Sequence, residues 1–202
     1  MPRPSTPESA ALNRAVKFVA LLNLSYFGIE FAVARAIGSV SLFADSIDFL
    51  EDAAVNGLIL VALGWSARRR STVGMILAAI LLAPAIATAW TAWGKFDSPV
   101  APAAVPLSVT GLGALAINLF CAVLLARFRA HRGSLTRAAF LSARNDALAN
   151  IAIIGAGGLT ALTLSPWPDL IVGVGILLMN LDAAREVYQA ARDERRAAVA
   201  EP

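Results

Sequence analysis

The sequence predicts an all-α membrane protein, a bundle of six transmembrane helices with both termini in the cytoplasm. The composition, the apolar runs and the distribution of basic residues support this prediction. Hydrophobic residues make up 58% of the 202 positions and charged residues only 15%, and the mean hydropathy is +0.68. Because charged residues make up roughly a quarter of a soluble domain, the composition excludes that class, and several spans leave no room for a separate soluble domain.

The apolar runs, interrupted by charge clusters and by Pro and Gly, define six candidate spans. Their ranges are 14–37, 41–66, 72–94, 106–129, 136–163 and 168–190. A helix needs about 20 residues to cross a bilayer, and only helices or closed barrels satisfy their backbone in lipid. We therefore expect a cytoplasmic tail without a signal peptide over 1–13, a six-helix transmembrane domain over 14–190 and a short cytoplasmic tail over 191–202.

The basic residues predict the orientation of these spans, because Lys and Arg concentrate on the cytoplasmic side. Of the 17 basic residues, 14 fall at run ends on one side of the predicted membrane. They are Arg3, Arg14, Lys17, Arg68, Arg69, Arg70, Arg127, Arg129, Arg132, Arg137, Arg185, Arg192, Arg195 and Arg196. Their position at run ends, and not on one amphipathic face, argues against nucleic acid as a partner. We expect a multi-pass protein of a bacterial-type inner (plasma) membrane.

Cys121 and His131 are the only residues of their types. Cys121 lies in an apolar run, LFCAVLL, so neither an internal disulfide nor a cysteine metal pair can form, and a small buried side chain is predicted. His131 lies in RFRAHRGS, where an exposed cytosolic side chain is predicted and not a metal ligand.

The second span concentrates four carboxylates in the stretch FADSIDFLEDAAVN. At about 100° per residue, Asp45, Asp48, Asp52 and Asn56 fall within an arc of roughly 80°, and Glu51 lies outside it. Ionisable residues inside a bilayer are costly and mark ion or substrate pathways. Some of these acids could instead be structural and pair with an arginine, but three on one face repel each other unless a cation or protons intervene. The pattern favours a cation site.

The fifth span carries a second polar stripe, formed by Ser142, Asp146 and Asn150, with Arg144 on another side. With a rise of about 1.5 Å per residue, Asp52 lies roughly 16 Å from one membrane face and Asp146 roughly 15 Å from the other. Both residues therefore reach the middle of the membrane. Oxygen ligands at one level on two facing helices can replace the hydration shell of a divalent cation.

These motifs resemble the cation diffusion facilitator (cation efflux) family. The resemblance covers the six-span topology and three motifs: Ser-x-Ser-Leu-x-x-Asp (Ser39, Ser41, Leu42, Asp45), Asp48-x-x-x-Asp52, and Asp146-Ala-Leu-x-Asn150. It implies proton-coupled efflux by alternating access, and not an enzyme. It implies no prosthetic group, and a divalent metal cation (zinc, manganese, iron, cobalt or cadmium) as the transported substrate.

The resemblance also implies the transport site. Two residues four apart in the second span and two in the fifth correspond to Asp48, Asp52, Ser142 and Asp146. Zinc exporters of the family usually have His at one or both of the positions of Asp48 and Ser142, so the metal is left open. Two further polar residues, Glu30 and Asn118, resemble positions in relatives, and we expect them to serve helix packing.

Two features bear on assembly. The family's usual cytoplasmic metal-binding domain does not follow the sixth span here, where the chain ends in AARDERRAAVAEP. The resemblance favours a homodimer, but packing within one protomer accounts equally well for five glycines of the last two spans. These are Gly155, Gly157, Gly158, Gly173 and Gly175.

Three other functions are compatible with a membrane bundle that carries aspartates. A metal-dependent lipid phosphotransferase would need a longer Asp-Gly and Ala-Arg signature near the cytosolic face, and an intramembrane aspartyl protease would need Asp flanked by Gly. Neither pattern is present. A non-transporting membrane partner or metal sensor remains the main alternative to transport.

Overall fold

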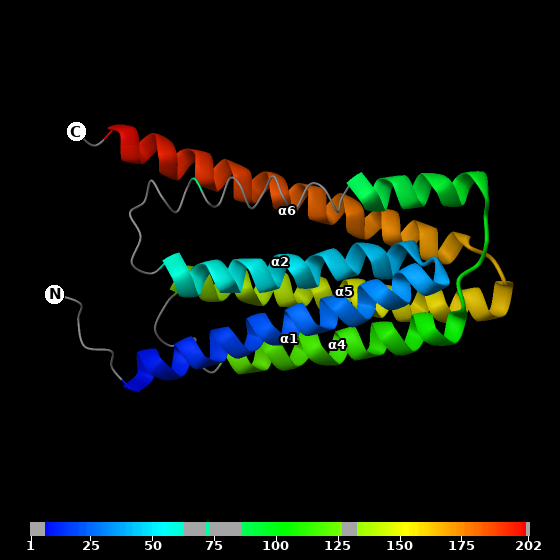
Figure 1. Ribbon diagram of the computed structural model, residues 1–202, viewed down its shortest axis with the longest axis horizontal. Helices are drawn as coiled ribbons and strands as arrows, with labels where there is room; N and C mark the ends of the chain where they lie inside the picture. Colours follow the sequence, from blue (N-terminus) through cyan, green and yellow to red (C-terminus); the bar gives the residue numbers. More distant parts are fainter. Residues whose placement is uncertain (1–6, 63–71, 73–85, 127–132, 201–202) are drawn as a thin grey trace.

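The computed structural model describes residues 7–62, 72, 86–126 and 133–200, and within these ranges the regular secondary structure is entirely helical. The helices are α1 (Pro7–Ile37), α2 (Val40–Ala62), α4 (Ala104–Ala126), α5 (Gly133–Thr163) and α6 (Trp167–Ala200). A further helical stretch covers residues 86–97. The predicted all-α class is confirmed for the described part of the chain (Figure 1).

The labelled helices run lengthwise beside one another, and α1 begins at the end of the bundle where α6 terminates (Figure 1). Helix α2 is central, because it contacts α1, α6, α5 and α4. Helices α4 and α5 form a second closely packed pair, and α1 and α6 each contact one member of it. The residues of α2 therefore face the interior of the bundle on several sides.

Helices α1 and α6 extend furthest beyond the predicted spans. Helix α1 begins at Pro7 and not at residue 14, and α6 continues to Ala200, ten residues past the predicted end at 190. The extension of α6 is rich in Ala and Arg, which are strong helix formers, so the helix continues beyond the apolar run. The predicted third span falls largely outside the described residues, and its helix ends at residue 97 and not at 94.

Three of the described helical segments are long and apolar enough to cross a membrane: Asn13–Ile37, Ala104–Ala126 and Asp146–Thr163. Helix α2 is also 23 residues long, but four carboxylates interrupt its apolar character. Large apolar side chains are exposed on the outer surface of the bundle, including Phe18 at 50% and Leu162 at 84%. Such an extensive apolar surface is typical of contact with lipid, and the chain is a membrane protein.

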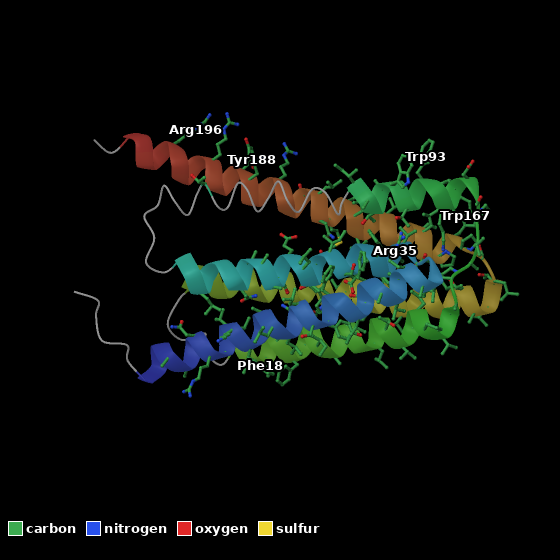
Figure 2. All side chains as sticks on the ribbon, viewed as in Figure 1. Phe18, Arg35, Trp93, Trp167, Tyr188 and Arg196 are labelled. Carbon is green, nitrogen blue, oxygen red and sulfur yellow. The ribbon has the colours of Figure 1, made fainter. Side chains whose placement is uncertain are left out.

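Aromatic side chains gather where residues 86–97 and the start of α6 meet. Trp93 and Trp167 lie at the end of the bundle opposite the C-terminal part of α6, which carries Tyr188 and Arg196 (Figure 2). The rings of Phe96 and Trp167 meet edge to face, with centroids 5.4 Å apart. Exposed tryptophans are characteristic of the membrane interface, so this end of the bundle is suited to a headgroup layer.

The apolar core lies around the first half of α2 and draws residues from all five labelled helices. Its buried members are Ala34, Leu42, Phe43, Ala44, Ile47, Leu107, Ala149, Ile153 and Ile176. Of the five glycines singled out in the sequence, Gly157 faces Ser108 and Gly173 faces the backbone of Val40 and Ser41. These two permit close helix approach within one chain, whereas a Cβ at any of the other three would meet no atom of another described helix within 4 Å.

A tight turn joins α1 to α2 and sets the start of the acidic helix. Gly38 has a φ of +65°, which ends α1 in the left-handed conformation that favours glycine. The amide of Ser39 then donates to the carbonyl oxygen of Ala34 at 3.0 Å. The Ser39 hydroxyl accepts from the amide of Leu42 at 3.1 Å and so caps α2.

Candidate metal transport site

The acidic residues of α2 face the interior of the bundle. Asp45 is fully buried, while Asp48, Asp52 and Asn56 are half-buried. Glu51, outside the predicted arc, is also half-buried. Packing of α2 against four other helices therefore withdraws the whole carboxylate cluster from solvent to different degrees.

Asp48 of α2 and Asp146 of α5 lie on two helices that contact each other. Asp146 is half-buried, and its carboxylate is, after that of Asp45, among the charges that interact electrostatically with Asp48. The predicted depths had placed Asp146 level with Asp52, and that pairing stays a prediction. Ser142 lies in α5 one turn before Asp146, and the side chains of Ser142 and Arg144 are outside the described part of the structure, as is all of His131.

Asn150 continues the polar stripe of α5 into the interior. It is fully buried, and its Nδ2 donates to the carbonyl oxygen of Asp146 at 2.8 Å. Its Oδ1 is buried without a hydrogen-bond partner among the described residues. Buried polar atoms are rarely left unsatisfied, so this oxygen is free to serve as a ligand.

Asn23 is a site neighbour that the sequence analysis missed. It is fully buried in α1, and its Nδ2 donates to Oδ2 of Asp52 at 3.3 Å. The Cys121 thiol donates in turn to Oδ1 of Asn23 at 3.7 Å, and Cys121 is buried as predicted. The feature of the sequence that could have indicated this role is the position of Asn23, a polar residue, inside an apolar run. These two hydrogen bonds link Cys121 to Asn23 and Asn23 to Asp52, and they orient the Asp52 carboxylate on the acidic face of α2.

The described acidic residues do not converge on a single point. Among the residues that the structure describes, no three His, Cys, Asp or Glu side chains are grouped closely enough to hold a metal ion. Of the predicted ligand set Asp48, Asp52, Ser142 and Asp146, the structure shows an electrostatic interaction between Asp48 and Asp146, and a hydrogen bond from Asn23 to Asp52.

Asp169, in the first turn of α6, is a second residue that the sequence analysis missed. Its Oδ1 accepts from the hydroxyl groups of Ser39 and Ser41, each at 2.6 Å. Its carboxylate also accepts from the backbone amides of Val40 at 2.9 Å and Ser41 at 3.2 Å. A buried carboxylate thus occupies the N-terminus of α2, where the helix dipole favours negative charge.

Lys95 supplies the positive charge at this end of the bundle. Its Nζ lies 3.6 Å from Oδ2 of Asp169, and both residues are buried. The serines of the Ser-x-Ser motif are therefore structural, since they hold α2 to α6. The feature of the sequence that could have indicated this contact is the position of Asp169, an acidic residue in the first turn of α6.

Of the two residues expected to serve helix packing, Asn118 is buried in α4. Glu30 behaves differently: it is fully buried in α1, but neither carboxyl oxygen has a hydrogen-bond partner in the described chain. The packing role expected for Glu30 therefore stays a prediction.

Comparison with known protein families agrees with this arrangement. The family model described as the cation efflux transmembrane domain matches residues 16–193, a range that includes every candidate site residue. No curated protein sequence matches the chain. The chain belongs to the cation efflux, or cation diffusion facilitator, family, and it is a membrane transporter of divalent cations in the general sense of that family.

Proposed function

We propose that the protein exports a divalent metal cation in exchange for protons, with the metal bound midway through a six-span bundle. The approach of Asp48 in α2 to Asp146 in α5 carries the proposal, because it joins carboxylates from two helices inside a membrane domain. Carboxylates in such a position are expensive to bury unless they bind a cation or protons. Both termini face the cytoplasm in this proposal, and the membrane is a bacterial-type inner membrane.

The metal ligands proposed are Asp48, Asp52, Ser142 and Asp146. Three carboxylates and a hydroxyl, without imidazole or thiolate, suit oxygen-preferring cations better than a histidine site does. Zinc also binds carboxylates well, so we propose broad transport of zinc, manganese, iron, cobalt and cadmium with a weak zinc preference. The unsatisfied Oδ1 of Asn150 is available to complete the shell.

Exchange by alternating access follows from the same charges. Carboxylates at one site bind either a metal ion or protons, so metal release is accompanied by proton uptake. The absence of a closed three-acid cluster among the described residues is compatible with a conformation in which the ligands are apart. Relative movement of α2 and α5 would assemble and open the site.

Metal uptake by vesicles that contain the purified protein tests the proposal. Asp146→Ala should abolish uptake of every metal, and Ser142→His should raise zinc or cadmium uptake relative to manganese. Asp97→Ala, at an exposed position, is the matched control. Normal transport by Asp146→Ala would show that α5 does not supply the ligand, and transport that ignores an imposed pH gradient would refute proton coupling.

The two alternative functions predict different results from vesicles that contain the purified protein. A non-transporting partner or metal sensor would bind metal without moving it, and a metal-dependent membrane phosphotransferase would turn over a phospholipid substrate. Family membership favours transport over both. We also propose a homodimer on the family's example, and a monomer in native mass spectrometry from mild detergent would contradict it.

A further inference from the structure

Two carboxyl groups outside the proposed ligand set face each other in the interior of the bundle. Glu30 of α1 and Asp45 of α2 are both fully buried. Their side chains approach each other closely enough to interact directly. Yet none of their four carboxyl oxygens has a hydrogen-bond partner among the described residues. Since buried polar atoms nearly always have partners, this pair requires an explanation.

Among the described residues, no positive charge compensates the pair. The other charged groups there that interact electrostatically with it are the carboxylates of Asp48 and Asp52. Lys95 is already paired with Asp169. Two adjacent buried carboxylates beside further acids cannot both remain ionised without a cation between them.

Neighbouring hydroxyl and amide groups do not satisfy the pair either. Tyr26 interacts electrostatically with both carboxyl groups, but its hydroxyl donates to the carbonyl oxygen of Thr110 at 2.7 Å. From α6, the Asn180 amide donates to the carbonyl oxygen of Ala44 at 3.3 Å. Both donors are therefore committed to backbone acceptors.

A proton shared between Glu30 and Asp45 accounts for two adjacent buried carboxyl groups without another partner among the described residues. When one carboxyl group is protonated, its O–H can donate to the other, and the charge of the pair falls from two to one. A divalent metal ion fits less well, because it needs four or more ligands, whereas the pair offers two side chains in a fully buried place. The proton is the cation that suits this site.

We propose that Glu30 and Asp45 form a proton-binding pair distinct from the metal ligands, and that its proton is exchanged for the transported metal ion. The inference rests on the proposed function. Asp45 lies one helical turn nearer the capped start of α2 than Asp48 does, and among the described side chains no hydrogen bond joins the pair to Asp48, Asp52 or Asp146. The two sites therefore influence each other through charge.

The direction of this coupling follows from electrostatics. A divalent ion arriving between Asp48 and Asp146 adds positive charge near the pair, so the shared proton leaves as H⁺ and both carboxyl groups become ionised. When the metal ion departs, one proton returns to the pair. Each cycle thus moves one proton at Glu30 and Asp45 against one metal ion at the neighbouring site, in addition to any protons on the metal ligands.

Infrared spectroscopy of the metal-free wild-type protein at neutral pH tests the pair without requiring transport. The carbonyl stretch of a protonated carboxyl group should be present and should weaken in Glu30→Gln and in Asp45→Asn. Asp97→Asn, an exposed carboxylate, should leave the band unchanged. Both test substitutions preserve size, and a wild-type protein without the band would overturn the proposal even if neither variant folded.

Proton release on zinc or manganese binding tests the exchange. Glu30→Gln should still bind metal but release about one proton fewer per ion than wild type, since metal binding displaces ligand-linked protons. Its vesicle transport should depend less on an imposed pH gradient. Proton release and gradient dependence equal to those of wild type would overturn the inference. A wild-type protein that binds two metal ions, one of which Glu30→Gln no longer binds, would overturn it as well. A wild-type protein that transports no metal would refute the proposed function. The infrared experiment would still show whether Glu30 and Asp45 share a proton.

Discussion

The Asp169 carboxylate accepts a hydrogen bond from the Ser41 hydroxyl at 2.6 Å and so joins the first turns of α6 and α2. The same carboxylate accepts from three further donors and pairs with Lys95. All of these residues except Lys95, at 9%, are essentially without exposure. A single side chain thus closes this end of the bundle around the start of the acidic helix.

Asp169→Ala should lower the thermal unfolding midpoint markedly, corresponding to about 3 kcal/mol, because it leaves Lys95 buried without its counter-charge. Asp169→Asn should have a smaller effect, since its amide oxygen can still accept from the serines. Thermal unfolding in detergent measures both. Asp97→Ala, at an exposed position near Lys95, is the control and should melt like wild type; equal midpoints for all variants would contradict a closing role for Asp169.

Gly173→Ala should destabilise the contact between α6 and α2. A Cβ at this position would lie 2.7 Å from the backbone nitrogen of Ser41 and from the carbonyl carbon of Val40, so the helices would have to separate. Overpacking of this kind costs about 1–3 kcal/mol. The thermal unfolding midpoint measures the loss.

Gly175→Ala provides the matched control for that substitution. Among the described residues, the added Cβ meets no atom of another helix within 4 Å, so we expect only helix propensity to change. We expect no loss and a gain of up to about 1 kcal/mol. If Gly175→Ala destabilised the protein as much as Gly173→Ala did, the close approach at Gly173 would not be the cause.

Asn23→Ala should weaken metal binding while leaving the fold intact. Its amide donates to Asp52, and loss of a partner that orients a ligand reduces metal affinity by about 10- to 100-fold. Isothermal titration with zinc or manganese measures the change. Ser25→Ala is the control, because the Ser25 hydroxyl is exposed and donates only to the Leu21 carbonyl of its own helix; a similar loss in both variants would exclude a specific effect on Asp52.

Ser98→Cys in a Cys121→Ala background should react with a membrane-impermeant thiol reagent added outside intact cells. Ser98 is exposed just beyond the helical residues 86–97, at the end of the bundle rich in tryptophan. The positive-inside distribution predicts that this segment faces out. Labelling only from the cytoplasmic side would reverse the orientation of all spans.

Much of the candidate site could be predicted from residue spacing alone. The repeat of 3.6 residues places Asp45, Asp48 and Asp52 on one helical face whatever the helix packs against. The apolar runs have to be helical because lipid offers the backbone no hydrogen bonds. Residue spacing also placed Asp52 and Asp146 at similar depths on helices of opposite direction, and in the structure the Asp146 carboxylate interacts electrostatically with that of Asp48. Which of these residues bind the metal stays a prediction.

The sequence by itself determined the all-helical membrane class, the acidic face of α2 and the polar stripe of α5, because each depends on local composition and helical periodicity. Only the tertiary structure decided that Asp169 closes the start of α2, that Asn23 orients Asp52, and that Glu30 faces Asp45. These pairs join separate helices, and their formation depends on which helices are neighbours and how each is rotated about its axis. Apolar patterning does not encode that rotation in a membrane, because lipid and a neighbouring helix are equally apolar surroundings.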